Sequence, residues 1–357
     1  MTTRRAFIAS VLASAALPSL TWADAGGPSF LSAAREPDGT YALFGLTLAG
    51  QETFRIPLPA RGHAGAAHPH QPEAVVFARR PGTYALVIDC LAGLVSRELT
   101  APAGYHFSGH GVFSADGQTL FTGEVDNVTG QGMIGVWAQT DSYRRVRSFP
   151  SGGIGPHEIL RLPGRDVLVV GNGGIIAALD DDRTKLNIDT MQSNLSYLSA
   201  SGDLLDQVTL LPDFHKNSIR HLAVDNDDRV VFGMQWEGDM TETPALIGMH
   251  KFGQDLRVLD VPQDVARRMA GYIGSIAVAS EGGTIAASCP KGNIMVLFDA
   301  TGAYSRMFER PDVCGLAPDA DSFVATDGFG GIVGITQTGM TPLQSADRAW
   351  DNHLVQI

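Results

Sequence analysis

A histidine recurs in this sequence at a regular interval and in a similar local setting. His110 lies 47 residues after His63, and His157 lies 47 residues after His110. This local pattern occurs seven times. We call the position of the histidine in each pattern the slot; it is occupied by His63, His110, His157, His221, Ser275, Cys314 and His353. A repeat of this length indicates one supersecondary unit built several times over, as in solenoids and propellers. It therefore predicts a fold in which equivalent residues meet at a common axis.

Each repeat has the pattern of four short strands. In the second repeat, alternating apolar and β-branched residues favour strands at 110–114, 119–124, 135–138 and 143–148, with an Asp-Gly turn between the first two. About 334 residues beyond a leader, divided by seven, give roughly 48 per repeat, the size of a four-stranded blade. The sequence predicts an all-β, seven-bladed β-propeller of the WD40 or YVTN-like type.

The seventh repeat is split between the two ends of the chain. The last six residues, 352–357, have the pattern of an inner strand only, whereas strands predicted at 30–33, 41–46 and 52–56 have no inner strand before them. A C-terminal strand that pairs with the N-terminal blade would close the ring and remove the open sheet edges. One short helix is predicted, at 263–269.

Two repeats are longer than the others. His157 and His221 are 64 residues apart, and His221 and Ser275 are 54 apart. The extra length falls in loops at 172–191 and 235–239. Long insertions in a compact repeat commonly carry function, although such a loop can also simply cover a blade.

The N-terminus has the pattern of an export leader. Arg4-Arg5 precedes an uncharged apolar run from about residue 9 to 20, and Thr-Trp-Ala at 21–23 is a possible cleavage site. The run is too short for a dependable membrane span. We expect a twin-arginine-type signal at 1–23, a single propeller domain at 24–357, a periplasmic location, and no stable membrane insertion after signal removal.

The charge balance excludes one class of partner. The formal net charge is −12, and loss of Arg4 and Arg5 would make it −14. An acidic surface repels phosphate backbones, so we expect no binding to nucleic acid.

The seven slots hold five imidazoles, one thiol and one hydroxyl group, which should meet at one place. Inner strands line the channel of a propeller, so residues at the start of each inner strand should form a ring at one mouth of that channel. Imidazole and thiolate bind transition metals tightly, and half of the ten histidines fall in these slots. The predicted metal ligands are His63, His110, His157, His221, Cys314 and His353, with iron or copper as candidate metals. The alternative is a structural ring that only hydrogen-bonds neighbouring blades.

Three further residues lie beside the ring in sequence. Glu158 follows His157 and could orient a ligating imidazole, as metal sites generally require. Arg220 precedes His221 and favours an anionic group on the ligand. His106 lies four residues before His110. We predict that these three residues contact a bound cofactor or support its ligands.

Several local motifs together resemble one protein family. They are Phe-Ser-Gly-His-Gly-Val-Phe-Ser at 107–114, Gly-Pro-His-Glu at 155–158, Leu-Asn-Ile-Asp-Thr-Met at 186–191, Ile-Arg-His-Leu-Ala at 219–223 and Trp-Asp-Asn-His at 350–353. In these the chain resembles the DUF1513 family of exported bacterial proteins of unknown function with propeller-like repeats. Members typically occur with imelysin-type and other periplasmic iron-uptake proteins, so the resemblance implies a location and a pathway. It supplies no catalytic residues.

Three functions remain open from the sequence. The first is binding of a metal or a metal-bearing ligand at the ring in support of iron acquisition, with other periplasmic iron-uptake proteins as partners. The second is a non-catalytic scaffold that docks a partner through the long insertions. The third is a metal-dependent oxidoreductase or a lactonase-like enzyme, which ranks last because lactonase-like propellers usually use carboxylate-rich calcium sites and this ring is rich in imidazole.

Overall fold

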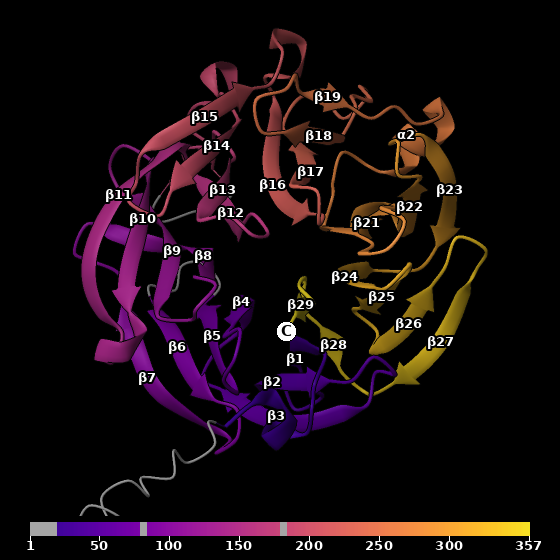
Figure 1. The fold of residues 1–357 in the computed structure, drawn as a ribbon. Helices are drawn as coiled ribbons and strands as arrows, with labels where there is room; N and C mark the ends of the chain where they lie inside the picture. The colour runs from indigo at the N-terminus through magenta and orange to yellow at the C-terminus, as the bar shows by residue number, and fades with distance from the viewer. Residues whose placement is uncertain (1–19, 79–83, 179–183) are drawn as a thin grey trace, which may run out of the picture.

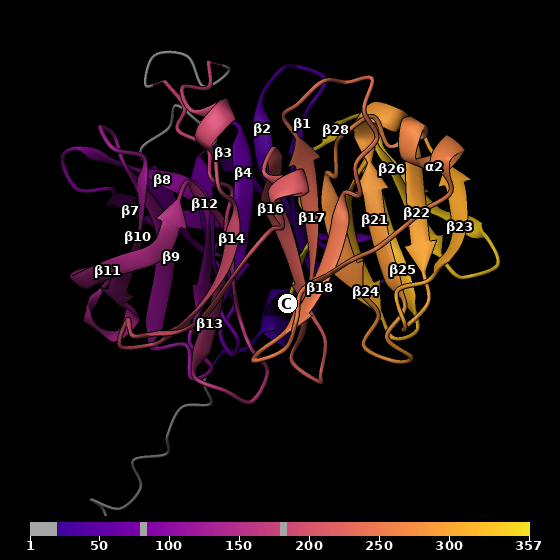
Figure 2. The ribbon, with the colours of Figure 1, turned by 90° about the horizontal axis from the view of Figure 1, so that it is seen from above.

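Seven antiparallel sheets surround a central axis (Figure 1). The computed structural model describes residues 20–78, 84–178 and 184–357. Each sheet is a blade whose first strand lies nearest the axis, and the blades stand side by side around the ring (Figure 2). The predicted all-β, seven-bladed propeller is confirmed.

Six blades are continuous in sequence. The first three consist of β4 (Gly62–Ala67), β5 (Glu73–Ala78), β6 (Tyr84–Asp89) and β7 (Leu94–Thr100); β8 (Tyr105–Phe113), β9 (Thr119–Asp126), β10 (Gln131–Ala138) and β11 (Arg144–Ile154); and β12 (Pro156–Arg161), β13 (Val167–Asn172), β14 (Asn194–Ser199) and β15 (Leu204–Thr209). The next three consist of β16 (Asn217–Val224), β17 (Arg229–Trp236), β18 (Ile247–Lys251) and β19 (Arg257–Val258); β20 (Ser275–Val278), β21 (Ile285–Cys289), β22 (Ile294–Phe298) and β23 (Tyr304–Glu309); and β24 (Val313–Asp319), β25 (Ser322–Asp327), β26 (Gly331–Ile335) and β27 (Met340–Ser345).

The seventh blade joins the two ends of the chain. It contains β1 (Phe30–Arg35), β2 (Tyr41–Leu46) and β3 (Glu52–Leu58), with β28 (Ala349–Trp350) and β29 (Val355–Gln356) as the inner strand. Ala34 of β1 pairs with Trp350, and Leu31 pairs with Val355. The predicted closure by the C-terminal strand is confirmed, with one difference: the inner strand is interrupted at 351–354.

Helices are short. The α-helix α2 (Gln263–Arg268) confirms the helix predicted from the sequence. The 3-10 helices are η1 (Trp22–Ala25), η2 (Gln139–Asp141), η3 (Ile188–Thr190), η4 (Pro212–Phe214) and η5 (Pro290–Gly292). No helix among the described residues is long and apolar enough to cross a membrane.

The hydrophobic core lies between neighbouring blades. Phe121, Ile134 and Val136 of the second blade pack against Ile159 and Val170 of the third, and all five are at most 5% exposed. Strand alternation explains this arrangement, because each blade presents one apolar face to each neighbour. Every blade therefore depends on the next, and closure at the seventh blade stabilises the whole ring.

Trp350 anchors the closing strand. Its ring lies edge-on to Phe44, with centroids 5.4 Å apart, and only 5% of the residue is exposed. We expect Trp350→Ala to lower the free energy of unfolding by about 3–5 kcal/mol, the usual cost of deleting a large buried aromatic side chain. Urea unfolding measures this, with Phe329→Ala as the control because Phe329 is 71% exposed. A loss below about 1 kcal/mol for Trp350→Ala would contradict the role of this strand in closure.

The last residues of the expected leader pack on the propeller. Trp22 is 8% exposed, and its indole Nε1 donates a hydrogen bond to the carbonyl of His68 at 2.8 Å. Cleavage after Ala23 would remove this side chain. Arg4 and Arg5 lie outside the described residues, so the export leader stays a prediction.

Candidate functional site

Five imidazoles converge on the propeller axis. We call His63, His110, His157, His221 and His353 the histidine ring. They come from five consecutive blades, the seventh and the first four, and Ser275 and Cys314 hold the two remaining slots. The ring centroids of His63 and His110 are 5.0 Å apart, and those of His110 and His157 are 4.6 Å apart. His353 lies 5.2 Å from His221 across the ring, so the imidazoles fill the channel.

Interruptions of the strand ladder accompany the ring positions. The pairing of β4 with β5 shifts between Gly62 and Gly65, and that of β8 with β9 shifts between Phe107 and Gly111. Similar shifts occur in β12 and β16, whereas β20, which carries Ser275, pairs regularly. Extra residues in a ladder re-aim side chains. We infer that these bulges turn the imidazoles toward the axis.

The glycine before His110 is required by close packing. Gly109 has φ +103°, a left-handed conformation that disfavours other residues, and a Cβ built there would lie 2.4 Å from Cδ2 of His63. The Ser-Gly-His motif therefore lets the imidazole of one blade lie against the backbone of the next.

The ring lies part-way along the channel. His110 is the sixth of nine residues in β8, and His221 is the fifth of eight in β16, so the expected position at the start of each inner strand is wrong for these two strands. On one side of the ring is a cavity of about 480 Å³ lined by His110, His353 and Glu158 and by small residues such as Ala66, Ala223 and Ala317. A small ligand could reach the ring through it.

Three members of the ring have the spacing of a metal site. Ligand atoms of His63, His110 and His353 all lie within 4.8 Å of one another. Nitrogen ligands of a tetrahedral ion with bonds of 2.0–2.1 Å are about 3.4 Å apart, so a small inward movement would complete such a site. In addition, His110 Nε2, His157 Nδ1, His221 Nδ1 and His353 Nε2 are buried and have no hydrogen-bond partner among the residues that the structure describes. Unpartnered buried nitrogens are costly, and coordination to a cation would satisfy them.

The ring is held in the neutral form that binds metals. Burial lowers the pKa of His221 to about 3 and that of His353 to about 4. Burial also lowers the pKa of His110 and His157 well below the usual value, and the neighbouring imidazoles add to the effect. At neutral pH these four rings therefore present lone pairs rather than charges.

Glu158 lies between two members of the ring, as its sequence position suggested. Its Oε1 is 3.9 Å from His110 Nδ1, and its Oε2 is 3.7 Å from His221 Nδ1. Oε2 also accepts a hydrogen bond from the amide of Leu222 at 2.8 Å. Burial raises the pKa of this carboxyl group, and the nearby His353 and the Leu222 amide partly oppose that rise. The carboxylate is placed to orient imidazoles or to offset the charge of a cation.

The other predicted residues lie in different surroundings. His106 is four residues earlier in β8, roughly 13 Å away at extended spacing, and its Nδ1 lies 2.6 Å from Oδ1 of Asn127. It does not belong to the close group of ligand atoms. Cys314 is buried and lines a cavity of about 230 Å³ with Arg61 and Asp351. It is also outside that close group, and its role as a ligand stays a prediction.

Arg220 occupies the bulge in β16 directly before His221. The register of β16 against β17 shifts between Ile219 and His221, and Arg220 is the residue between them. Its Nε is buried and has no hydrogen-bond partner within residues 20–78, 84–178 and 184–357. The long insertions meet close by, since Lys185 forms an ion pair with Glu237. The sequence analysis did not identify this ion pair, because the two residues are 52 positions apart and in different repeats.

Comparison with known proteins identifies the family. A family model described as "Protein of unknown function (DUF1513)" matches residues 56–357. The chain belongs to the DUF1513 family. This confirms the resemblance seen in the sequence motifs. A comparison with curated proteins finds no match.

Solved structures are similar in fold alone. A chain of Kuenenia stuttgartiensis hydrazine synthase is 14% identical with a TM-score of 0.61, over 94% of this chain and 99% of that one. A chain of a mitotic checkpoint complex is 13% identical with a TM-score of 0.55, over 78% of each chain. At these identities, the activity of neither protein can be carried over.

Proposed function

We propose that this protein is a periplasmic propeller that binds a transition metal ion, or a ligand carrying one, at the histidine ring and assists iron acquisition. The observation that supports it best is the convergence of five imidazoles from five blades. Four of these imidazoles have a buried nitrogen without a hydrogen-bond partner in the described part of the chain. A ring that only held the blades together would be expected to use those nitrogens in hydrogen bonds.

The nitrogen donors of the ring favour a metal ion of borderline softness. Imidazole nitrogens suit iron, copper, zinc and nickel, and in divalent form copper binds such sites most tightly. Iron is proposed as the physiological metal because members of the family typically occur with iron-uptake proteins. The ring would supply three or four ligands, with His63, His110 and His353 as the nearest set. Glu158 would offset part of the charge.

The test is the metal content of the native protein. We expect protein purified after export in its own host to carry about one equivalent of iron or copper by mass spectrometry. The His110→Ala/His157→Ala variant, prepared in the same way, should carry none above background. Equal metal content in both proteins, or none in either, would reject the proposal.

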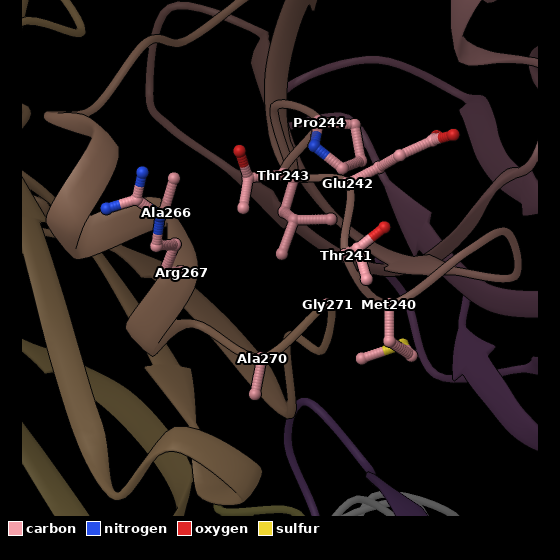
Figure 3. A pocket seen from close by; sticks show the side chains of 10 residues that line it. Met240, Thr241, Glu242, Thr243, Pro244, Ala266, Arg267, Ala270 and Gly271 are labelled. Carbon is pink, nitrogen blue, oxygen red and sulfur yellow. The ribbon is translucent and has the colours of Figure 1, made fainter.

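A second candidate function is a scaffold for a periplasmic partner. A groove of about 210 Å³ separates the loop at Met240–Pro244 from α2 (Figure 3). Met240 on this loop is 59% exposed, and Leu186 on the other insertion is 63% exposed. Exposed apolar side chains on long loops are suited to docking. On this alternative, deletion of residues 185–191 would abolish capture of an iron-uptake protein, whereas ring variants would capture it normally.

A further inference from the structure

The cavity beside the histidine ring occupies one end of the channel. In each inner strand its lining begins at the slot, or within two residues after it, and continues toward the C-terminal end of that strand. All seven blades therefore contribute to it. We call this cavity of about 480 Å³ the chamber. Its volume lies within the range of about 300–1,000 Å³ that is usual for sites of small organic molecules, and it is far larger than one metal ion requires.

The walls of the chamber are mainly apolar. Of the described side chains that line it, only those of Glu158 and Arg161 carry a formal charge. Hydrocarbon side chains from six different inner strands form most of the wall, among them Ala66, Val112, Leu160, Ala223, Ala277 and Ala317. The water shell of a hydrated ion would face hydrocarbon here, whereas an apolar organic group would gain free energy by leaving water. The chamber therefore suits an organic ligand better than a hydrated ion.

Two imidazoles lie at the inner end of the chamber. His110 and His353 both line it, and they are 3% and 7% exposed. Their ring centroids are 4.8 Å apart, and the Nε2 of each has no hydrogen-bond partner in the part of the chain that the structure describes. Buried polar atoms are normally satisfied. An apolar pocket with a few convergent polar groups is the usual form of a ligand site.

A metal at the ring would have coordination positions left over. His63, His110 and His353 offer three nitrogen ligands, whereas ions with tetragonal or octahedral geometry need more. The chamber supplies few further donors, because most of its wall beyond Glu158 and Ser275 is hydrocarbon. The remaining ligands of the metal would therefore belong to the molecule that brings it.

We propose that the histidine ring receives its metal as an organic chelate, and that the chamber binds the apolar part of that chelate. The inference rests on the proposed metal site and names the class of ligand that the site takes. The ring would hold the metal on one side, the chelating groups would complete its coordination, and the apolar groups would fill the space between the inner strands.

The test varies the apolar part of a chelate and keeps its donors constant. Copper is supplied to the metal-free protein as its neutral complex with glycine, alanine, norvaline or norleucine, all of which bind copper through the same amino and carboxylate groups. Burial of each added carbon should raise the affinity about fourfold at the usual hydrophobic increment. We expect copper norleucinate to bind at least about tenfold more tightly than copper glycinate in calorimetric titrations, with a steady gain along the series.

Two double variants change the chamber and leave the ring intact. Ala66→Leu/Ala223→Leu fills part of the space and should lower the affinity for copper norleucinate to that for copper glycinate. Val112→Thr/Val224→Thr keeps the shape of the wall but makes it more polar, so it should reduce the gain along the series even if the filled variant folds poorly. Ala92→Leu, at an exposed turn position, is the matched control and should behave as wild type.

A neutral apolar dye gives a readout that needs no metal. N-phenyl-1-naphthylamine should bind the metal-free wild-type protein with a rise in fluorescence, and Ala66→Leu/Ala223→Leu should bind it more weakly. Copper norleucinate should displace the dye from wild type. Dye that stays bound when copper norleucinate binds would contradict a shared site in the chamber.

The outcomes separate the chamber from the metal site. Equal affinity for all four copper complexes in wild type, or an unchanged gain along the series in both double variants, would reject the chamber as the ligand site and leave the metal site in place. Copper binding in none of the four forms would reject the metal site and the chelate together.

Discussion

The His110→Ala/His353→Ala variant should bind Cu²⁺ at least about a thousandfold more weakly than the wild-type protein. These two residues are part of the group whose ligand atoms lie within 4.8 Å of one another. Loss of a residue that only supports a metal ligand typically costs 10–100-fold in affinity, so loss of two direct ligands should cost more. Competition with a chromophoric chelator at pH 7 measures the change.

A matched pair of histidines serves as the control. His70 and His215 are both exposed and lie outside the ring, so His70→Ala/His215→Ala should leave the affinity unchanged. Glu158→Gln should lower it by about 10–100-fold, because the carboxylate acts through His110 and His221. If the ring variant binds copper as tightly as the control variant, the ring is not the site.

Acid should destabilise the metal-free protein well above the pH at which carboxylates normally titrate. The folded-state pKa values of His221 and His353, about 3 and about 4, lie below the value of about 6.5 expected for an unfolded chain. Between these limits the unfolded state binds more protons, so stability is full above about pH 6.5 and falls as the pH is lowered toward 4. Each histidine contributes a slope of up to about 1.4 kcal/mol per pH unit. Glu158, with its raised pKa, opposes this loss at the acidic end of the window.

The measurement is the free energy of unfolding between pH 7.5 and pH 4. His221→Asn/His353→Asn should flatten the curve, since asparagine does not titrate, and His70→Ala/His215→Ala should not. Cu²⁺ should raise the stability of wild type most at neutral pH, because binding to the folded state adds stability and protons compete for the same nitrogens. Parallel curves for wild type and the ring variant would show that these imidazoles are not held neutral by burial.

The architecture could be predicted because its signals lie in short stretches of the sequence. Strand alternation and the recurring slot repeat in every blade, turn residues such as Asp116-Gly117 separate strands, and the split repeat required a closing strand near His353. The position of the ring along the channel could not be predicted, since it depends on bulges. The register of β8 against β9 shifts between Phe107 and Gly111, on either side of His110. The spacing of the histidines in the sequence cannot show such a shift. Gly109 was a sequence signal of the close packing between the His63 ring and the backbone before His110.

The chemistry around the ring was only partly predictable. Glu158 was found because it is adjacent to His157 in sequence, and strand geometry carries it toward the ring. His106 lies four residues of extended chain before His110, next to Asn127, and its role beside a cofactor stays a prediction. The surroundings of Arg220 could not be predicted, because the ion pair between Lys185 and Glu237 joins insertions of two different blades.

X-ray absorption spectroscopy of the copper-loaded protein tests the metal site most directly. A metal at the histidine ring should show a first shell of at least three nitrogen scatterers at about 2.0 Å, with the multiple scattering that identifies imidazole. The His110→Ala/His353→Ala variant should lose that pattern. A first shell of oxygen atoms without imidazole scattering in wild type, or an identical spectrum in the variant, would contradict a metal site at the histidine ring.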